Sequence, residues 1–196
     1  MFRRRLVLAA LAAPVAARAE TSLIDALRRG GHTVYMRHAI TDRSQADTGR
    51  LGDRAGQRNL SEAGRAQAEA LGRALRSLGV PVGEVLASPV FRAADTAALA
   101  FGANRYRIEP FLTADDYTHD GALLAANIAR TRQRLAEAPR SGNDILVGHI
   151  VPLAMVLGRS VAQSQFPEGA LAVFRPGPAA TLLGILPAEE VIAAAG

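Results

Sequence analysis

The sequence predicts an α/β fold, built as one domain around a largely parallel sheet. Short apolar runs of strand length alternate along the chain with longer segments of helical periodicity, a pattern typical of α/β proteins. The chain has 196 residues, of which 49% are hydrophobic, so it is long and apolar enough to bury a core. No internal repeat, low-complexity tract or long linker divides it. We therefore expect a single domain over residues 20–196.

Short apolar runs mark the expected strands. They cover residues 33–36, 84–87, 144–148, 170–174 and 181–186, with a brief edge strand at 107–108. The last two form a pair that is joined through a Pro-Gly-Pro segment. Residues 39–59 show no period and are rich in Asp, Arg, Gly and Gln, so we interpret them as a long functional loop.

Helical segments separate these strands. We expect helices at residues 21–30, between Ser61 and Gly79, from residue 88 onward, at 121–138 and at 152–157. Ser61 suits an N-cap, three leucines follow it on one face, and Gly79 suits the end of that helix. Ser88 and Pro89 suit the cap and the first turn of the next helix.

The N-terminus has the features of an export signal. Arginines at positions 3–5 precede the apolar stretch Leu6–Ala17, which is too short to span a bilayer comfortably. Ala17-Arg18-Ala19 has the small-x-small form of a cleavage site. We expect residues 1–19 to be a signal peptide, either Sec-type or twin-arginine, and the mature protein to be periplasmic or secreted. The alternative is a buried or membrane-anchoring helix; no other stretch is apolar enough to span a membrane.

Much of the net charge of +5 lies in this N-terminal segment. Residues 1–19 hold four Arg and no acid, so the remainder has 19 Arg against 18 Asp and Glu, a net charge of about +1. We therefore expect no nucleic-acid partner, and we interpret Arg130, Arg132 and Arg134 as a solvated helix face. The absence of Cys excludes disulfides, Cys-ligated zinc and thiol catalysis.

Polar residues that suit an anion follow three of the expected strands. Arg37 and His38 follow the first, Arg92 comes shortly after the second, and His149 follows the strand at 144–148. The carboxyl ends of parallel strands share one edge of a sheet, so these side chains are expected to converge there. Arg binds phosphate oxygens in a bidentate manner, and a neutral imidazole is a competent nucleophile near pH 7. The set therefore indicates phosphoryl chemistry.

Four segments resemble the motifs of the histidine phosphatase superfamily, which includes the phosphoglycerate mutases. They are Tyr-Met-Arg-His-Ala at 35–39, the helix start at 60–68, Ala-Ser-Pro-Val-Phe-Arg-Ala-Ala-Asp-Thr-Ala at 87–97 and Leu-Val-Gly-His at 146–149. They stand in the order of the family's motifs, and the resemblance covers residues 32 to 175. It implies a three-layer α/β sandwich, in which a central, mostly parallel mixed sheet has helices on both faces.

The resemblance also implies roles for residues. His38 is expected to be the nucleophile that becomes phosphohistidine. Arg37, Arg92 and His149 are expected to bind the phosphoryl group, and Thr41 to lie near the phosphate. No metal or cofactor is expected, because Arg and His supply the positive charge that Mg²⁺ supplies elsewhere.

The chain departs from the family at two positions. Ala39 replaces the usual Gly after the histidine, a change of one methyl group that we expect the site to tolerate. Many members carry a catalytic Glu around the position of Ala114, where the nearest carboxylates here are Asp115 and Asp116. We prefer Asp115 as the general acid, followed by Asp116 and then Glu109.

The implied reaction is hydrolysis of a phosphomonoester through a phosphohistidine. Together with export, the resemblance to small members such as the lipopolysaccharide core heptose-phosphate phosphatase implies an envelope sugar phosphate as substrate. Two alternatives remain open: a phosphohistidine-protein phosphatase, and a non-catalytic phosphate-binding member that lacks a competent acid. The sequence carries no signature of oligomeric state.

Overall fold

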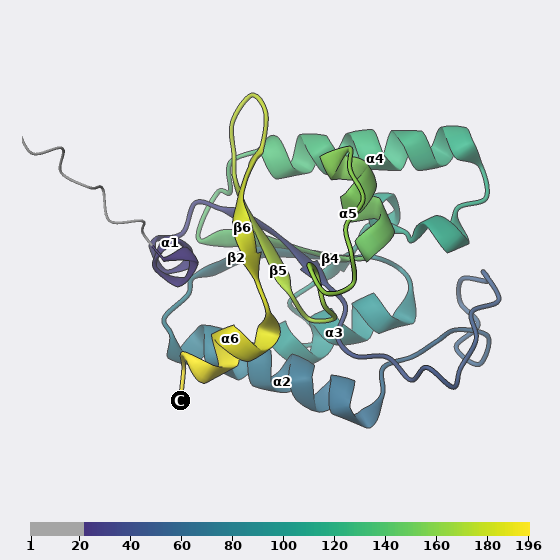
Figure 1. Ribbon diagram of the computed structural model, residues 1–196, viewed down its shortest axis with the longest axis horizontal. Helices are drawn as coiled ribbons and strands as arrows, with labels where there is room; N and C mark the ends of the chain where they lie inside the picture. The colour runs from purple at the N-terminus through teal and green to yellow at the C-terminus, as the bar shows by residue number, and fades with distance from the viewer. Residues whose placement is uncertain (1–21) are drawn as a thin grey trace, which may run out of the picture.

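The computed structural model describes residues 22–196, so the expected signal peptide lies outside the described residues. Its centre is a six-stranded sheet in the order β3-β2-β4-β1-β5-β6 (Figure 1). The strands are β1 Thr33–Arg37, β2 Val82–Ala87, β3 Arg107–Ile108, β4 Asn143–Gly148, β5 Leu171–Arg175 and β6 Thr181–Leu186. Strands β1 to β4 pair in parallel, whereas β5 is antiparallel to β1 and β6. The predicted mixed, mostly parallel sheet is confirmed.

Helices cover both faces of this sheet and complete the expected three layers (Figure 1). One face carries α4 Gly121–Ala136 and α5 Ile150–Leu157, and the other carries α2 Glu62–Ser77, α3 Phe91–Phe101 and α6 Ala188–Ala193. The remaining elements are α1 Leu23–Arg29 and two short 3-10 turns, η1 Pro110–Leu112 and η2 Asp115–Tyr117. Within residues 22–196, no helix has the length and apolar character needed to cross a membrane.

The central strand β1 contributes to two hydrophobic cores. Val34 and Met36 pack in the core shared with α2, α3 and α6, whereas Tyr35 packs in the core shared with α4 and α5. Successive side chains of a strand point to opposite faces, so a sheet covered on both faces buries every residue of its central strands. This explains why β1 is buried along its whole length.

Helix α2 packs closely against the chain that follows His38. The Ser61 hydroxyl accepts a hydrogen bond from the Gly64 N–H at 3.0 Å, which confirms Ser61 as the N-cap. A Cβ on Gly64 would overlap the carbonyl oxygen of Ile40, so only Gly permits this approach. The first turn of α2 thereby fixes the backbone next to the predicted nucleophile.

The expected cap of α3 is wrong. The helix begins at Phe91 after Val90, which makes no side-chain cap bond, so Ser88 and Pro89 both precede the helix. The Ser88 hydroxyl lies instead 2.9 Å from Nε2 of His149. Ser88 therefore belongs to the polar cluster at the ends of the strands rather than to the end of the helix. Helix α6 was not expected from the sequence.

Candidate active site

The parallel strands bring the predicted residues to one edge of the sheet. His38 follows β1, His149 follows β4, and their ring centroids are 5.4 Å apart. The exposed fractions of Arg37, His38, Arg92 and His149 are 4%, 3%, 3% and 3%. The sequence thus correctly placed two histidines and two arginines together in a buried cluster.

His38 has one ring nitrogen fixed by the backbone. Its Nδ1 lies 2.9 Å from the carbonyl oxygen of Ala39. A carbonyl can only accept, so Nδ1 carries the proton and Nε2 keeps its lone pair. Burial and the nearby charge of Arg92 hold the pKa of His38 well below its usual value. The imidazole is therefore neutral near pH 7, and Nε2 carries the free lone pair.

His149 is oriented by Ser88. Nε2 of His149 lies 2.9 Å from the Ser88 hydroxyl oxygen, which also accepts a hydrogen bond from the Val90 N–H at 3.2 Å. When the hydroxyl donates to Nε2, the imidazole proton sits on Nδ1, a buried atom with no protein partner. Burial and Arg92 lower the pKa of His149 as well. Nδ1–H is then a neutral donor available to a ligand.

Three arginines surround the histidines. The Nε atoms of Arg37, Arg58 and Arg92 are buried and have no hydrogen-bond acceptor in the protein. Arg58 was missed in the sequence, although it lies only two residues before the motif at residues 60–68. Its charge contributes to lowering the pKa of both His38 and His149. Buried donors without acceptors are rare, and this set is suited to the oxygens of an anion.

A family model matches the part of the chain that carries most of this cluster. Residues 34–113 match the histidine phosphatase superfamily (branch 1), and this range includes His38, Arg58 and Arg92. This part of the chain is therefore similar to the histidine phosphatase superfamily. No curated protein sequence matches the chain.

Solved phosphatase structures share the fold of this chain. The protein histidine phosphatase SixA complexed with tungstate has a TM-score of 0.58 at 16% identity, covering 82% of this chain and 99% of its own. A putative alpha-ribazole-5'-P phosphatase from Escherichia coli K-12 has a TM-score of 0.58 at 19% identity, covering 81% and 98%. Phosphoserine phosphatase from Entamoeba histolytica, in complex with 3-phosphoglyceric acid, has a TM-score of 0.55 at 16% identity, covering 82% and 98%.

Asp47 is a further residue of the candidate site that the sequence did not indicate. Its carboxylate accepts hydrogen bonds from Arg92, from the Tyr117 hydroxyl and, at 2.8 Å, from the Arg58 N–H. Burial raises the pKa of Asp47, but these donors and the charge of Arg92 outweigh it, and the pKa is lowered overall. Asp47 is therefore ionised and anchors the loop of residues 39–59 to the site.

The Thr41 side chain forms a hydrogen bond with a carboxylate. Its hydroxyl donates to Oε1 of Glu168 at 2.7 Å, and the same oxygen lies 4.0 Å from Arg37. Thr41 is thus connected to Arg37 through Glu168, and its predicted position beside the phosphate stays a prediction.

The two candidate acids lie on η2, with different surroundings. Asp116 lies 3.6 Å from a terminal nitrogen of Arg92, and its side chain is 46% exposed. Burial raises the pKa of Asp116 with help from the charges of Asp115 and Asp47, although Arg92 opposes the shift. The side chain of Asp115 makes no hydrogen bond or ion pair within residues 22–196, and only its backbone carbonyl accepts one, from the Thr118 N–H at 3.1 Å.

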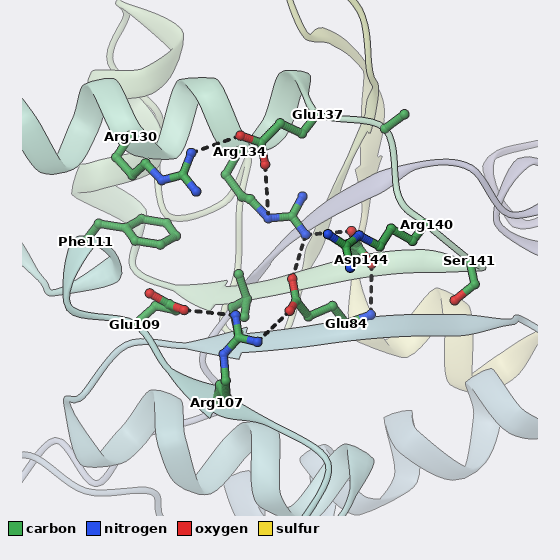
Figure 2. A pocket seen from close by; sticks show the side chains of 12 residues that line it. Glu84, Arg107, Glu109, Phe111, Arg130, Arg134, Glu137, Arg140, Ser141 and Asp144 are labelled. Carbon is green, nitrogen blue, oxygen red and sulfur yellow. Dashed lines mark hydrogen bonds and ion pairs between the residues drawn. The ribbon is translucent and has the colours of Figure 1, made fainter.

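A separate cavity of about 520 Å³ lies over β2 and β4 beneath α4 (Figure 2). Arg134 is buried there, which contradicts the predicted solvated face. It contacts Asp144 at 2.6 Å and Glu84 at 2.9 Å, because α4 packs against the strands that carry these carboxylates. Glu109, the third candidate acid, pairs with Arg107 in the same cavity, at 3.1 Å. Each carboxylate here has an Arg partner, so the network is a structural connection between α4 and the sheet.

Metal-ligating side chains do not gather in the described part of the chain. Within residues 22–196 there is no group of three or more His, Asp or Glu placed to hold an ion. Positive charge at the histidines is supplied by Arg37, Arg58 and Arg92.

Proposed function

We propose that this histidine phosphatase hydrolyses phosphomonoesters through a phosphohistidine at His38. One observation carries the proposal: a neutral histidine with a free Nε2 lies among buried donors that have no acceptor. These donors are Nδ1 of His149 and the Nε atoms of Arg37, Arg58 and Arg92. A phosphoryl group has three non-bridging oxygens and would satisfy them.

The reaction follows from this geometry in two steps. Nε2 of His38 attacks phosphorus in line, a P–N bond forms, and the P–O bond to the leaving alkoxide breaks while a carboxylic acid gives the alkoxide its proton. Water then attacks phosphorus, the P–N bond breaks, and the same carboxylate accepts a proton from the water. The products are an alcohol and inorganic phosphate, and His38 returns to its neutral form.

We assign the acid role to Asp116 in preference to Asp115. Its raised pKa favours the protonated form that an acid needs, and its contact with Arg92 brings it to the group that would hold the phosphate. Asp47 beside it has a lowered pKa and stays ionised. Environments that shift the pKa values of neighbouring carboxyl groups apart are the usual mark of an acid and a permanent charge.

An envelope sugar phosphate is the substrate that we propose. The signal-like N-terminus supports export. A hollow of about 250 Å³ beside Arg37 has the polar lining residues Arg43, Gln67, Gln163 and Glu168. Such side chains suit the hydroxyl groups of a sugar.

A phosphohistidine-protein phosphatase is the second candidate. The fold likeness to SixA, which is described as a protein histidine phosphatase, favours it. Export disfavours it, because phosphorelay proteins are cytoplasmic. A panel of sugar phosphates, nucleotides and phosphohistidine, assayed with and without EDTA, separates the candidates, and activity should survive the chelator.

Replacement of the nucleophile tests the mechanism. His38→Ala should abolish turnover, and rapid acid-free quenching of the wild type with a ³²P-labelled ester should trap base-stable, acid-labile label that the variant lacks. His119→Ala, at an exposed position, is the control and should behave as the wild type. Near-normal turnover by folded His38→Ala would refute the proposal.

A further inference from the structure

A tyrosine hydroxyl binds both main-chain groups of His149. The Tyr35 hydroxyl donates to the carbonyl oxygen of His149 at 3.1 Å and accepts a hydrogen bond from the His149 N–H at 3.0 Å. Tyr35 is completely buried in β1, and its ring packs in the core beneath α4 and α5. The sequence places Tyr35 in the first strand and assigns it no role at the site.

These bonds are made where regular hydrogen bonding stops. The pairing of β1 with β4 ends at Arg37 and Gly148, and α5 begins at Ile150. His149 stands between the strand and the helix, so its N–H has no strand partner. The Tyr35 hydroxyl takes that place by reaching along the sheet from the position that pairs with Leu146.

The neighbouring residue leaves room for this hydroxyl. A Cβ on Gly148 would overlap the Tyr35 hydroxyl oxygen, although the φ angle of Gly148 is not positive. Gly148 is therefore required for space rather than for backbone freedom. Tyr35 and Gly148 together form a fitted junction at the start of α5.

We infer that Tyr35 is a positioning residue that fixes the backbone of His149, so that Ser88 can hold the imidazole with Nδ1 toward the phosphoryl group. The contacts of Tyr35 fix the position of the His149 backbone, and the Ser88 contact at Nε2 fixes the orientation of the imidazole ring. Neither contact alone fixes both the backbone position and the ring orientation. The kinetic part of this inference rests on the proposed phosphatase function.

The electrostatics agree with a hydroxyl that remains a donor. Burial raises the pKa of Tyr35 above its usual range; the hydrogen bond with the His149 backbone opposes the shift and the charge of Asp115 adds to it. The hydroxyl therefore keeps its proton near neutral pH, and both contacts persist there.

Tyr35→Phe removes the hydroxyl and keeps the ring. We expect kcat to fall roughly tenfold with KM within about twofold, because His149 acts on charge that develops in the transition state. Tyr106→Phe, a half-buried tyrosine outside the site, is the matched control and should keep the wild-type kcat. Wild-type kcat in Tyr35→Phe would overturn the inference.

A second background separates positioning from general loss of structure. In His149→Ala, the further change Tyr35→Phe should leave kcat unchanged, because a residue that acts through His149 has nothing left to position. The same tenfold loss in both backgrounds would mean that Tyr35 acts on the fold or on another group, and would overturn the inference.

An NMR measurement tests the positioning without activity. The chain contains four His, so ¹⁵N-labelled imidazoles give a small set of signals. Tyr35→Phe should shift the ring nitrogens of His149, while those of His32 and His119 stay in place and report that the fold is intact. Unchanged His149 signals would refute the positioning role, whereas an inactive wild type with shifted signals would refute only the proposed function.

Discussion

Both carboxylate oxygens of Asp47 lie within hydrogen-bond distance of one guanidinium nitrogen of Arg92, at 3.1 and 3.0 Å. The side chain of Arg92 is almost completely buried, and its Nε has no hydrogen-bond partner among residues 22–196. A residue of an irregular loop therefore helps to orient Arg92, which we propose as a phosphate ligand. Binding of an anion should depend on that loop.

Asp47→Ala should weaken the binding of inorganic phosphate, measured as its inhibition constant, by roughly tenfold. The reason is that Arg92 loses the contact that orients it, and one charge-assisted hydrogen bond contributes about that much. Asp47→Asn keeps an oxygen that can accept from Arg92 and should change the constant much less. If both variants bind phosphate more tightly than the wild type, Asp47 competes with phosphate for Arg92 instead of orienting it.

Protonation of the two site histidines should destabilise the fold. Their pKa values in the folded chain lie well below the usual 6.5, mainly because both rings are buried. Below pH 6.5 the unfolded chain therefore binds more protons than the folded one, and stability falls as the pH falls. Urea denaturation at pH 7.5, 6.5 and 5.5 should show a decreasing free energy of unfolding. A His38→Gln/His149→Gln variant should lose much of this slope between pH 7.5 and 5.5, and an equal slope would contradict the assignment.

Removal of Arg134 should cost stability and spare activity. Arg134→Met leaves the buried carboxylate of Asp144 without its cation, which costs about 3–5 kcal/mol in comparable buried pairs. Arg134→Met/Asp144→Asn should recover part of the loss, because the remaining group is neutral. Arg65→Met, at an exposed position of α2, is the control. Urea denaturation measures these effects. The kcat per folded molecule should not change, because Asp144 lies near the start of β4 whereas His149 follows its end.

The sequence was most informative where residues follow strands. Arg37, His38 and His149 stand directly after apolar runs, so the topology of a parallel sheet brings them together without any detail of packing. Asp47 and Arg58 could not be found in this way. They lie in a loop whose path depends on contacts between distant residues, such as the 3.0 Å hydrogen bond from the Phe91 N–H to Gln57.

Side chains with two suitable environments were the main source of error. Ser88 before a helix is a good N-cap by sequence. Only the position of β4 shows that the Ser88 hydroxyl contacts the His149 ring instead. Arg134 resembles its exposed neighbours on α4 until the helix is packed against Asp144. Propensity and periodicity describe local structure, and such partners are set by tertiary packing.

Substitution of each candidate acid in turn tests which of them protonates the leaving group. An alkyl phosphate has a poor leaving group and needs a proton donor, whereas p-nitrophenyl phosphate has a good one and needs it much less. Asp116→Asn should therefore slow phosphorylation of His38 by alkyl phosphates by roughly 10²–10⁴-fold, the usual range for general acid catalysis, and should slow the aryl reaction far less.

Single-turnover rates are the measurement to use, because the same carboxylate would activate water in the second step and would obscure a steady-state comparison. Asp115→Asn is the matched control, one residue away on the same turn. If Asp115→Asn shows the dependence on leaving group and Asp116→Asn does not, the acid is Asp115, and the contact between Asp116 and Arg92 serves only to hold the arginine. If neither variant shows it, no carboxylate of η2 protonates the leaving group, and a phosphate-binding member without a competent acid becomes the better description.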